Sequence, residues 1–97
     1  MANIKIKYVV VGYGNHSRSK IIPQLIKTKA LYGIVSSQIN LKIKSINIFK
    51  NIKSALDNCN KNIIFILCSP PEVHYKQAKL ILGNNFNILI EKPIFLK

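Results

Sequence analysis

The chain has 97 residues, of which 48% are hydrophobic and 19% are charged. This length and composition fit one folded domain and exclude the intrinsically disordered class. The formal charge of +12 is unusual, but the lysines are spread along the chain without a dense block or interleaved aromatic residues, which argues against a nucleic-acid surface. We interpret the charge mainly as compositional bias toward Lys, Asn and Ile, with attraction of a phosphate-bearing cofactor as a second interpretation.

Short apolar runs predict the strands of the fold. They are rich in β-branched residues and too short for helices, which is typical of strands buried on both faces of a parallel sheet. The run at residues 46–49 is the weakest, and residues 38–44 before it form a poorly defined crossover. The predicted strands are residues 8–11, 31–35, 46–49, 63–67 and 86–90.

Segments with helical spacing separate these runs. Residues 19–30 place apolar side chains on one face, with Pro23 near the first turn, where its missing N–H is tolerated. Residues 51–58 support a short helix. Residues 69–72 (Ser-Pro-Pro-Glu) are a capping-box pattern that predicts the start of a third helix, and Gly83 ends it.

The alternation of strand and helix predicts an α/β fold with a doubly wound, Rossmann-like parallel sheet of about five strands. Right-handed crossovers give the strand order 3-2-1-4-5 in the simplest case. The loops that follow the strands then gather at the carboxyl edge of the sheet, where folds of this kind bind their ligands. We therefore expect one domain, residues 1–97, with its site at that edge.

The first of these loops begins with Gly12 and Gly14, directly after an apolar run. A Gly-x-Gly turn between a strand and a helix lets backbone amides approach a pyrophosphate and aims the positive end of the helix at it. Ser17 replaces the third glycine of the usual motif and is small enough to keep the helix close to the strand. A plain turn is the alternative. The other candidate cofactor contacts in this turn are Tyr13, Asn15 and His16.

The second predicted strand ends in Ser36 and Ser37 and not in a carboxylate. A carboxylate there would accept hydrogen bonds from the ribose of NAD and repel the 2′-phosphate of NADP. Two hydroxyls, with Arg18 within reach, suit a 2′-phosphate better. We therefore expect NADP or NAD as the cofactor, with a slight preference for NADP. A serine turn without a ligand is the alternative.

Three patterns in the chain resemble the amino-terminal half of the Gfo/Idh/MocA oxidoreductases. They are the glycine turn, residues 68–74 (Cys-Ser-Pro-Pro-Glu-Val-His), and Glu91-Lys92-Pro93 after the last predicted strand. The Pro-Pro-x-x-His and Glu-Lys-Pro patterns, about 20 residues apart, are specific in combination. The resemblance covers nearly the whole chain. It implies a dinucleotide-binding domain of an enzyme that transfers hydride between a nicotinamide cofactor and a hydroxyl-bearing, sugar-like substrate.

The resemblance also implies roles for individual residues. Lys92 matches the lysine that reaches the nicotinamide and the reacting hydroxyl, and Glu91 matches the glutamate that helps to hold it. A cation there also stabilises a developing alkoxide, whereas a solvated Glu-Lys turn is the alternative. His74 matches a histidine near the cofactor, and a packing role is equally open for it. The remaining candidate cofactor contacts are Ser69, Pro70, Pro71, Glu91 and Lys92.

Members of the family continue beyond Glu-Lys-Pro with another strand and a substrate-binding domain, whereas this sequence ends at Lys97. We expect the isolated chain to bind cofactor without turnover, because half a crevice cannot hold a substrate at the nicotinamide. The alternatives are an enzyme whose missing domain comes from a separate chain, and a Rossmann-fold binding or scaffold protein with a basic surface. The fifth strand then lies at the sheet edge, which favours self-association.

The cysteines do not indicate a metal site, and the hydrophobic runs do not indicate a membrane-spanning segment. Cys59 and Cys68 lack the spacing of a metal site, and Cys68 ends an apolar run, which is typical of a core thiol. No run approaches the ~20 apolar residues of a membrane span. Residues 8–11 are too short for the apolar part of a signal peptide. We therefore expect a cytoplasmic protein.

Overall fold

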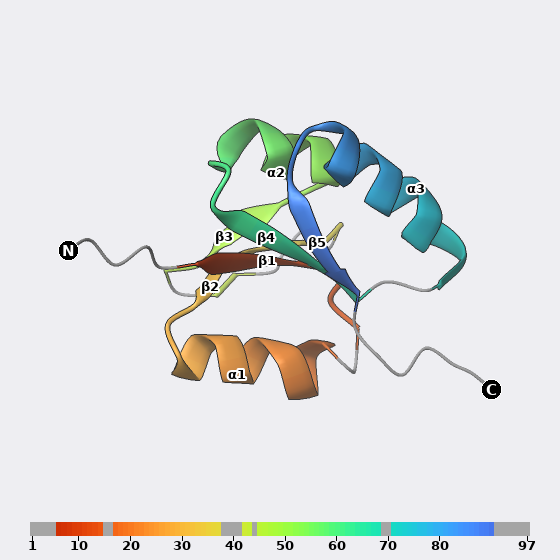
Figure 1. Cartoon of the computed structure of the whole chain (residues 1–97). Coiled ribbons are helices and arrows are strands. Elements are labelled where there is room, and N and C mark those ends of the chain that lie inside the picture. The colour runs from red at the N-terminus through yellow and green to blue at the C-terminus, as the bar shows by residue number, and fades with distance from the viewer. Residues whose placement is uncertain (1–5, 15–16, 38–41, 44, 69–70, 91–97) are drawn as a thin grey trace.

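The computed structural model describes residues 6–14, 17–37, 42–43, 45–68 and 71–90. These residues form a parallel sheet in the order β3-β2-β1-β4-β5, with helices on both faces (Figure 1). The predicted fold class and strand order are confirmed. The strands are β1 (Lys7–Val11), β2 (Leu31–Val35), β3 (Asn47–Phe49), β4 (Ile63–Leu67) and β5 (Asn87–Ile90). The helices are the π-helical turn η1 (Ser17–Ile21), α1 (Ile22–Lys27), α2 (Ile52–Asn58) and α3 (Pro71–Gly83).

Two apolar layers hold the helices to the sheet. On one face, α2 and α3 cover a cluster that contains Val9, Phe65 and Ile81, all fully buried. Phe65 also meets Phe86 edge-on, with ring centroids 5.3 Å apart. On the other face, α1 covers a smaller cluster built on Val10 and neighbouring β2 residues. Burial on both faces explains why the central strands are continuous apolar runs.

The helix after β1 begins as a π-helical turn. Pro23 lies in the first turn of α1, as the sequence predicted. Proline has no N–H to donate to the carbonyl of Ser19, and its ring crowds that carbonyl, so an i→i−4 bond cannot form at this point. The wider π turn of residues 17–21 accommodates this gap. The regular part of the helix is consequently shorter than the predicted residues 19–30.

The other boundaries lie close to the predicted ones. The side chain of Asn51 accepts a hydrogen bond from the Ser54 N–H at 2.8 Å and caps α2. The helix α3 begins at Pro71 and ends at Gly83, where the capping-box pattern and the glycine placed its ends. None of the helices in the described residues is long and apolar enough to cross a membrane.

Gly33 in the middle of β2 is required by the close approach of β3. A Cβ atom at this position would lie 2.8 Å from the carbonyl oxygen of Asn47 and 2.8 Å from the Phe49 ring. The Asn47 carbonyl belongs to the backbone of the neighbouring strand, so it cannot move aside without disturbing the pairing of β2 with β3. The sequence indicated a strand here but no reason for the glycine.

Gly33→Ala should therefore destabilise the fold by about 1–3 kcal/mol, the usual cost of overpacking a close contact. The measurement is the urea midpoint followed by circular dichroism. Gly83→Ala is the matched control, because a Cβ atom there meets nothing within 4 Å. It should be neutral or stabilising, since alanine favours helix more than glycine does. Equal midpoints for the two variants would contradict the close approach.

Candidate functional site

The carboxyl ends of the strands lie in one row. Val11 of β1 pairs with Val35 of β2 and with Leu67 of β4, and Leu67 pairs in turn with Ile90 of β5. The ladder continues one residue further, because the Gly12 N–H donates to the Val35 carbonyl at 3.0 Å. The loops after β1, β2, β4 and β5 therefore start side by side, as the strand order requires.

The glycine turn that follows β1 has open space on its outer side. Gly12 has φ 105°, a conformation that glycine adopts without strain. A Cβ atom on Gly14 would meet nothing within 4 Å, so the space above this residue is free of the described protein atoms. In the described part of the chain, the N–H groups of Tyr13 and Gly14 have no hydrogen-bond acceptor. This turn can accept an anionic group close to its backbone.

Ser17 closes the turn from inside. Its side chain is 1% exposed, and its hydroxyl lies 2.9 Å from the Gly12 carbonyl oxygen and 3.2 Å from the Gly14 carbonyl oxygen. The small side chain keeps the helix close to the strand, which is what the sequence indicated. The hydroxyl is directed into the turn, however, and satisfies backbone acceptors there. Ser17 thus shapes the turn from within.

Tyr13 and Arg18 face each other across this turn. The Arg18 guanidinium carbon lies 5.6 Å from the centre of the Tyr13 ring, within the range of a cation–π contact. The backbone N–H of Arg18 also donates to the Gly14 carbonyl at 3.0 Å, which ties the backbone of this residue to the glycine turn. A planar guanidinium with its fork of donors is well suited to recognising a phosphate group.

Ser36 and Ser37 follow β2 directly, next to the start of the glycine turn. The Ser36 N–H donates to the Phe49 carbonyl at 2.9 Å, which extends the pairing with β3. Ser36 is half-buried and Ser37 is exposed. The structure thus places both serines on the carboxyl edge, where the sequence analysis put them, with Ser37 open to solvent.

His74 lies one turn into α3, and this helix begins on the side of the molecule where β4 and β5 end (Figure 1). Its Nε2 atom is shielded from solvent and has no hydrogen-bond partner in the described part of the chain. A buried polar atom left unpaired costs about 1–3 kcal/mol, which a ligand group that bonds to it would recover. The sequence named His74 as a candidate, but only the packing of α3 isolates this atom.

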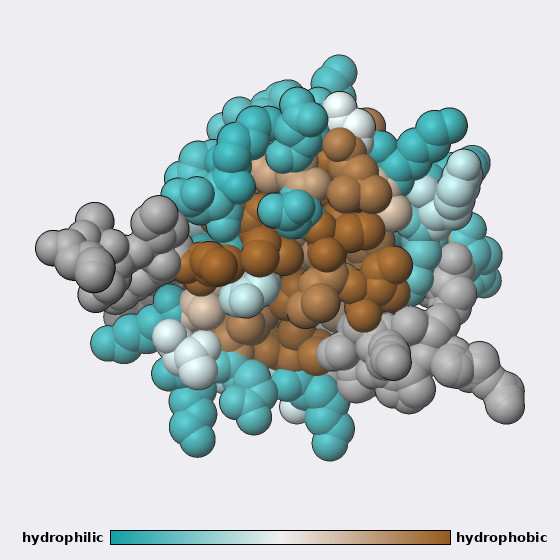
Figure 2. All heavy atoms as spheres, in the orientation of Figure 1, coloured by the Kyte–Doolittle hydropathy of each residue, from teal (hydrophilic) through white to brown (hydrophobic). Residues whose placement is uncertain are grey.

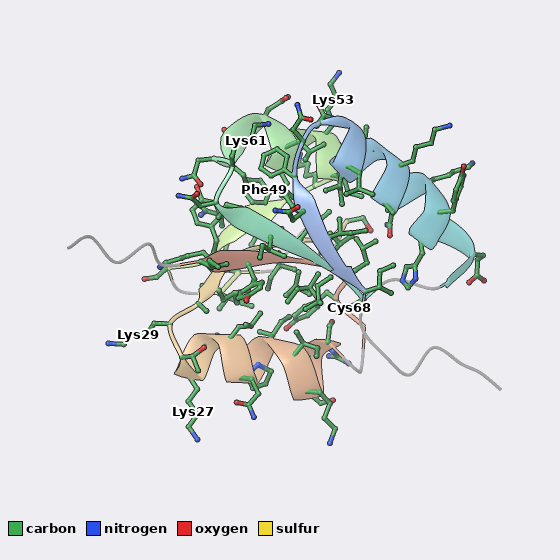
Figure 3. The ribbon with its side chains drawn as sticks, in the orientation of Figure 1. Lys27, Lys29, Phe49, Lys53, Lys61 and Cys68 are labelled. Carbon is green, nitrogen blue, oxygen red and sulfur yellow. The ribbon has the colours of Figure 1, made fainter. Side chains whose placement is uncertain are left out.

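Several predicted contacts lie outside the described residues: Asn15, His16, Ser69, Pro70, Glu91 and Lys92. The backbone of Pro71 begins α3. The sequence still connects two of these segments to the site, because residues 69–70 follow β4 after Cys68, and residues 91–92 follow β5 directly. Figure 3 shows Cys68 at the end of the sheet where β4 and β5 finish.

Cys59 is not placed to act as a nucleophile at neutral pH. Burial raises the pKa of the Cys59 thiol to about 11, so the unreactive protonated form persists. Cys59 and Cys68 are both half-buried against the two apolar layers of the sheet, in line with the core role predicted for Cys68.

Residues 6–97 match the profile of the Gfo/Idh/MocA family, described as an oxidoreductase family with an NAD-binding Rossmann fold. The chain belongs to this family. The NAD-binding Rossmann fold is the one that describes this family, and the resemblance seen in the sequence is confirmed. A comparison with curated proteins gave no match.

Solved structures show the same fold. The chain is similar to a D-galactose-1-dehydrogenase from Rhizobium etli, with a TM-score of 0.77 at 24% identity over 98% of this chain and 31% of that one. It is also similar to the WlbA dehydrogenase from Bordetella pertussis, solved with NADH and UDP-GlcNAcA, with a TM-score of 0.76 at 20% identity over 98% of this chain and 30% of that one. The 97 residues thus span less than a third of these relatives.

The inward hydrogen bonds of Ser17 predict a stability effect. Ser17→Ala should lower the free energy of unfolding by about 1 kcal/mol, because one hydroxyl donor to the turn carbonyls is lost. Urea unfolding without cofactor measures it. Ser37→Ala, on the exposed side of the same edge, is the control and should change the midpoint little. A Ser17→Ala variant as stable as the wild type would show that the two hydrogen bonds contribute nothing.

Proposed function

We propose that these 97 residues form a single dinucleotide-binding domain, residues 1–97, of an enzyme that transfers hydride to or from a hydroxyl-bearing, sugar-like substrate. The observation that carries the proposal is the open space above Gly14, at the row where the strands end. The nucleotide-sugar ligand and the NADH named for the WlbA relative, and the sugar named for the galactose dehydrogenase, support the substrate class.

In this proposal different described residues bind different parts of the cofactor. The N–H groups of Tyr13 and Gly14 bind the pyrophosphate, because they have no acceptor among the described residues and belong to the turn beside the open space. Arg18 and the exposed Ser37 receive the ribose and any 2′-phosphate. His74 bonds through its shielded Nε2 to a polar group of the ligand. The other predicted contacts, named above, complete the site from its outer side.

Lys92 and Glu91 supply the chemistry in the same proposal. When bound, the nicotinamide ring accepts or gives up the hydride. Lys92 stabilises the alkoxide that develops on the substrate oxygen, and Glu91 holds the ammonium group in place. Turnover also needs a substrate-binding domain, which is not contained in these 97 residues and comes from the same polypeptide or a separate one. The 97 residues by themselves bind cofactor without turnover.

Gly14→Val tests the cofactor site directly. No atom of the described residues lies within 4 Å of a Cβ atom at this position, so the variant should fold with an unchanged urea midpoint. It should nevertheless lose dinucleotide binding in a fluorescence titration with NADH, because the side chain fills the volume that the pyrophosphate needs. A variant that folds and binds NADH like the wild type would show that the glycine turn is only a turn.

The same titration tests the proposed preference for NADP. NADPH should bind more tightly than NADH by about 1–3 kcal/mol if Arg18 and the serines hold the 2′-phosphate through charge-assisted bonds. Repeating the titration at raised salt separates this from the +12 charge of the chain, since a merely basic surface then loses its preference. Arg18→Gln should remove the difference. Equal affinities in the wild type, or a preference for NADH, would contradict the role given to Arg18 and the serines.

We also propose that the isolated chain self-associates through β5. In the described residues β5 pairs only with β4, and its outward side chains Leu89 and Ile90 are 53% and 42% exposed. Figure 2 shows hydrophobic residues gathered on this side of the molecule, in front of the sheet. An apolar strand with an unpaired edge templates pairing with a second copy.

Light scattering across a salt series measures this association. The wild type should form larger species as salt screens its charge, while Leu89→Lys should stay monomeric. Leu82→Lys on α3 is the matched control, because Leu82 is 52% exposed and the substitution adds the same charge. It should associate like the wild type. If both lysine variants behave alike, net charge and not the strand edge governs the state of the chain.

A further inference from the structure

A cavity of about 430 Å³ lies at the amino-terminal edge of the sheet, opposite the glycine turn. It is bordered by the first residues of β1 and β2, the turn after α1, and the segment before β3. Its size falls within the range of small-molecule sites. Because the strand ends that form the candidate cofactor site lie at the other edge, this cavity belongs to a different site.

The walls of the cavity are apolar. They are formed by Ile26, Leu31, Ile43 and Ile46. Leu31 is buried in the apolar layer under α1, and Ile43 and Ile46 pack against the same layer. Ile26 is 46% exposed, so a large apolar side chain borders the opening. Such walls favour the hydrocarbon part of a ligand.

The remaining lining residues are two cations and a hydroxyl: Lys7, Lys29 and Ser45. The Tyr8 N–H donates to the Ala30 carbonyl at 2.8 Å, which holds the start of β1 beside the turn that carries Lys29. No acidic residue lines the cavity within the described part of the chain. Figure 3 shows Lys29 extending outward at the end of the sheet away from Cys68. Positive charge and apolar surface thus border the same cavity.

The two polar residues of the turns stand in a disfavoured backbone conformation. Lys29 has φ 60° and Ser45 has φ 66°. Lys29 follows α1 at the position where helices usually end in glycine, as shown by the bonds from its N–H to the Ile26 carbonyl and from the Ala30 N–H to the Leu25 carbonyl. Side chains held at such positions against the local preference often serve a site.

A role of Lys29 in capping α1 does not account for its position. The last carbonyls of the helix, on Gln24, Leu25 and Ile26, already accept backbone N–H groups. The hydroxyl of Thr28 reaches two of them as well. Lys27, in the last turn of α1, supplies a cation at the same helix end without lining the cavity. The charge of Lys29 is therefore not needed to stabilise the carboxyl end of α1.

We propose that this cavity binds an amphipathic carboxylate. The hydrocarbon part lies between the isoleucines and Leu31, and the carboxylate lies at the mouth, where Lys29 and Lys7 neutralise it and the Ser45 hydroxyl donates to it. This site is independent of the proposed cofactor site, and its test does not involve a dinucleotide.

Octanoate is the probe, followed by NMR of isoleucine δ-methyl groups at low salt. Saturable shifts should appear at the methyls of Ile26, Ile43 and Ile46. Octanol, which lacks the charge, and acetate, which lacks the tail, should each bind more weakly than octanoate. Equal binding of octanol, or no saturable shift with octanoate, overturns the proposal. Shifts only in the presence of phosphatidylglycerol vesicles would identify a basic membrane-facing surface and also overturn it.

Lys29→Gly separates binding from folding. The variant should raise the urea midpoint, because glycine suits the conformation after α1. It should weaken octanoate binding by about fivefold, the effect of losing one partly screened ion pair. Lys27→Ala is the matched control: it removes the same charge from the same helix end and should leave the affinity nearly unchanged. Equal losses in the two variants would show that only general charge attracts the probe.

Discussion

The parallel pairing of β1 with both β2 and β4 is the interaction on which the rest of the structure depends. Val11 at the end of β1 is in register with Val35 on one side and Leu67 on the other. The hydrogen bonds of Gly12 to Val35 and of Cys68 to Val11 carry this register one residue past the strands. Loops distant in sequence therefore leave the sheet at one level. A shift of one residue would exchange the side chains between the two apolar layers and move the loops to different levels.

The glycine turn combines an open outer side with a filled inner side. The Ser17 side chain lies inside the turn, where its hydroxyl donates to the backbone carbonyls of Gly12 and Gly14. Pro23 cannot form one hydrogen bond of the first helical turn, and residues 17–21 therefore form a wider π turn. Together these residues fix how the helix leaves the strand, so the positions of Tyr13 and Arg18 follow from the packing of a serine and the covalent shape of a proline.

The two edges of the sheet carry different kinds of side chain and therefore suit different kinds of ligand. The carboxyl edge carries glycine, small hydroxyl residues and a histidine with an isolated nitrogen, a combination that suits a polar, extended ligand. The amino edge carries isoleucines under two lysines, which suits a shorter ligand with a hydrocarbon body. The lysines that the composition attributed to general bias therefore have one local arrangement in which charge and apolar surface meet.

Local signals in the sequence determined the order and type of the elements, the strand order 3-2-1-4-5 and the edge where the candidate site residues gather. These depend on hydrophobic periodicity, on glycine and proline, and on the handedness of crossovers, all of which act over short stretches of chain. Only the tertiary structure decided that Asn47 and Phe49 approach Gly33 too closely for a side chain at that position. It also decided that the Ser17 hydroxyl is directed into the turn and that the His74 Nε2 atom is shielded from solvent. Each of these depends on the distance between backbones brought together by folding, and no periodicity within a single segment encodes such a distance.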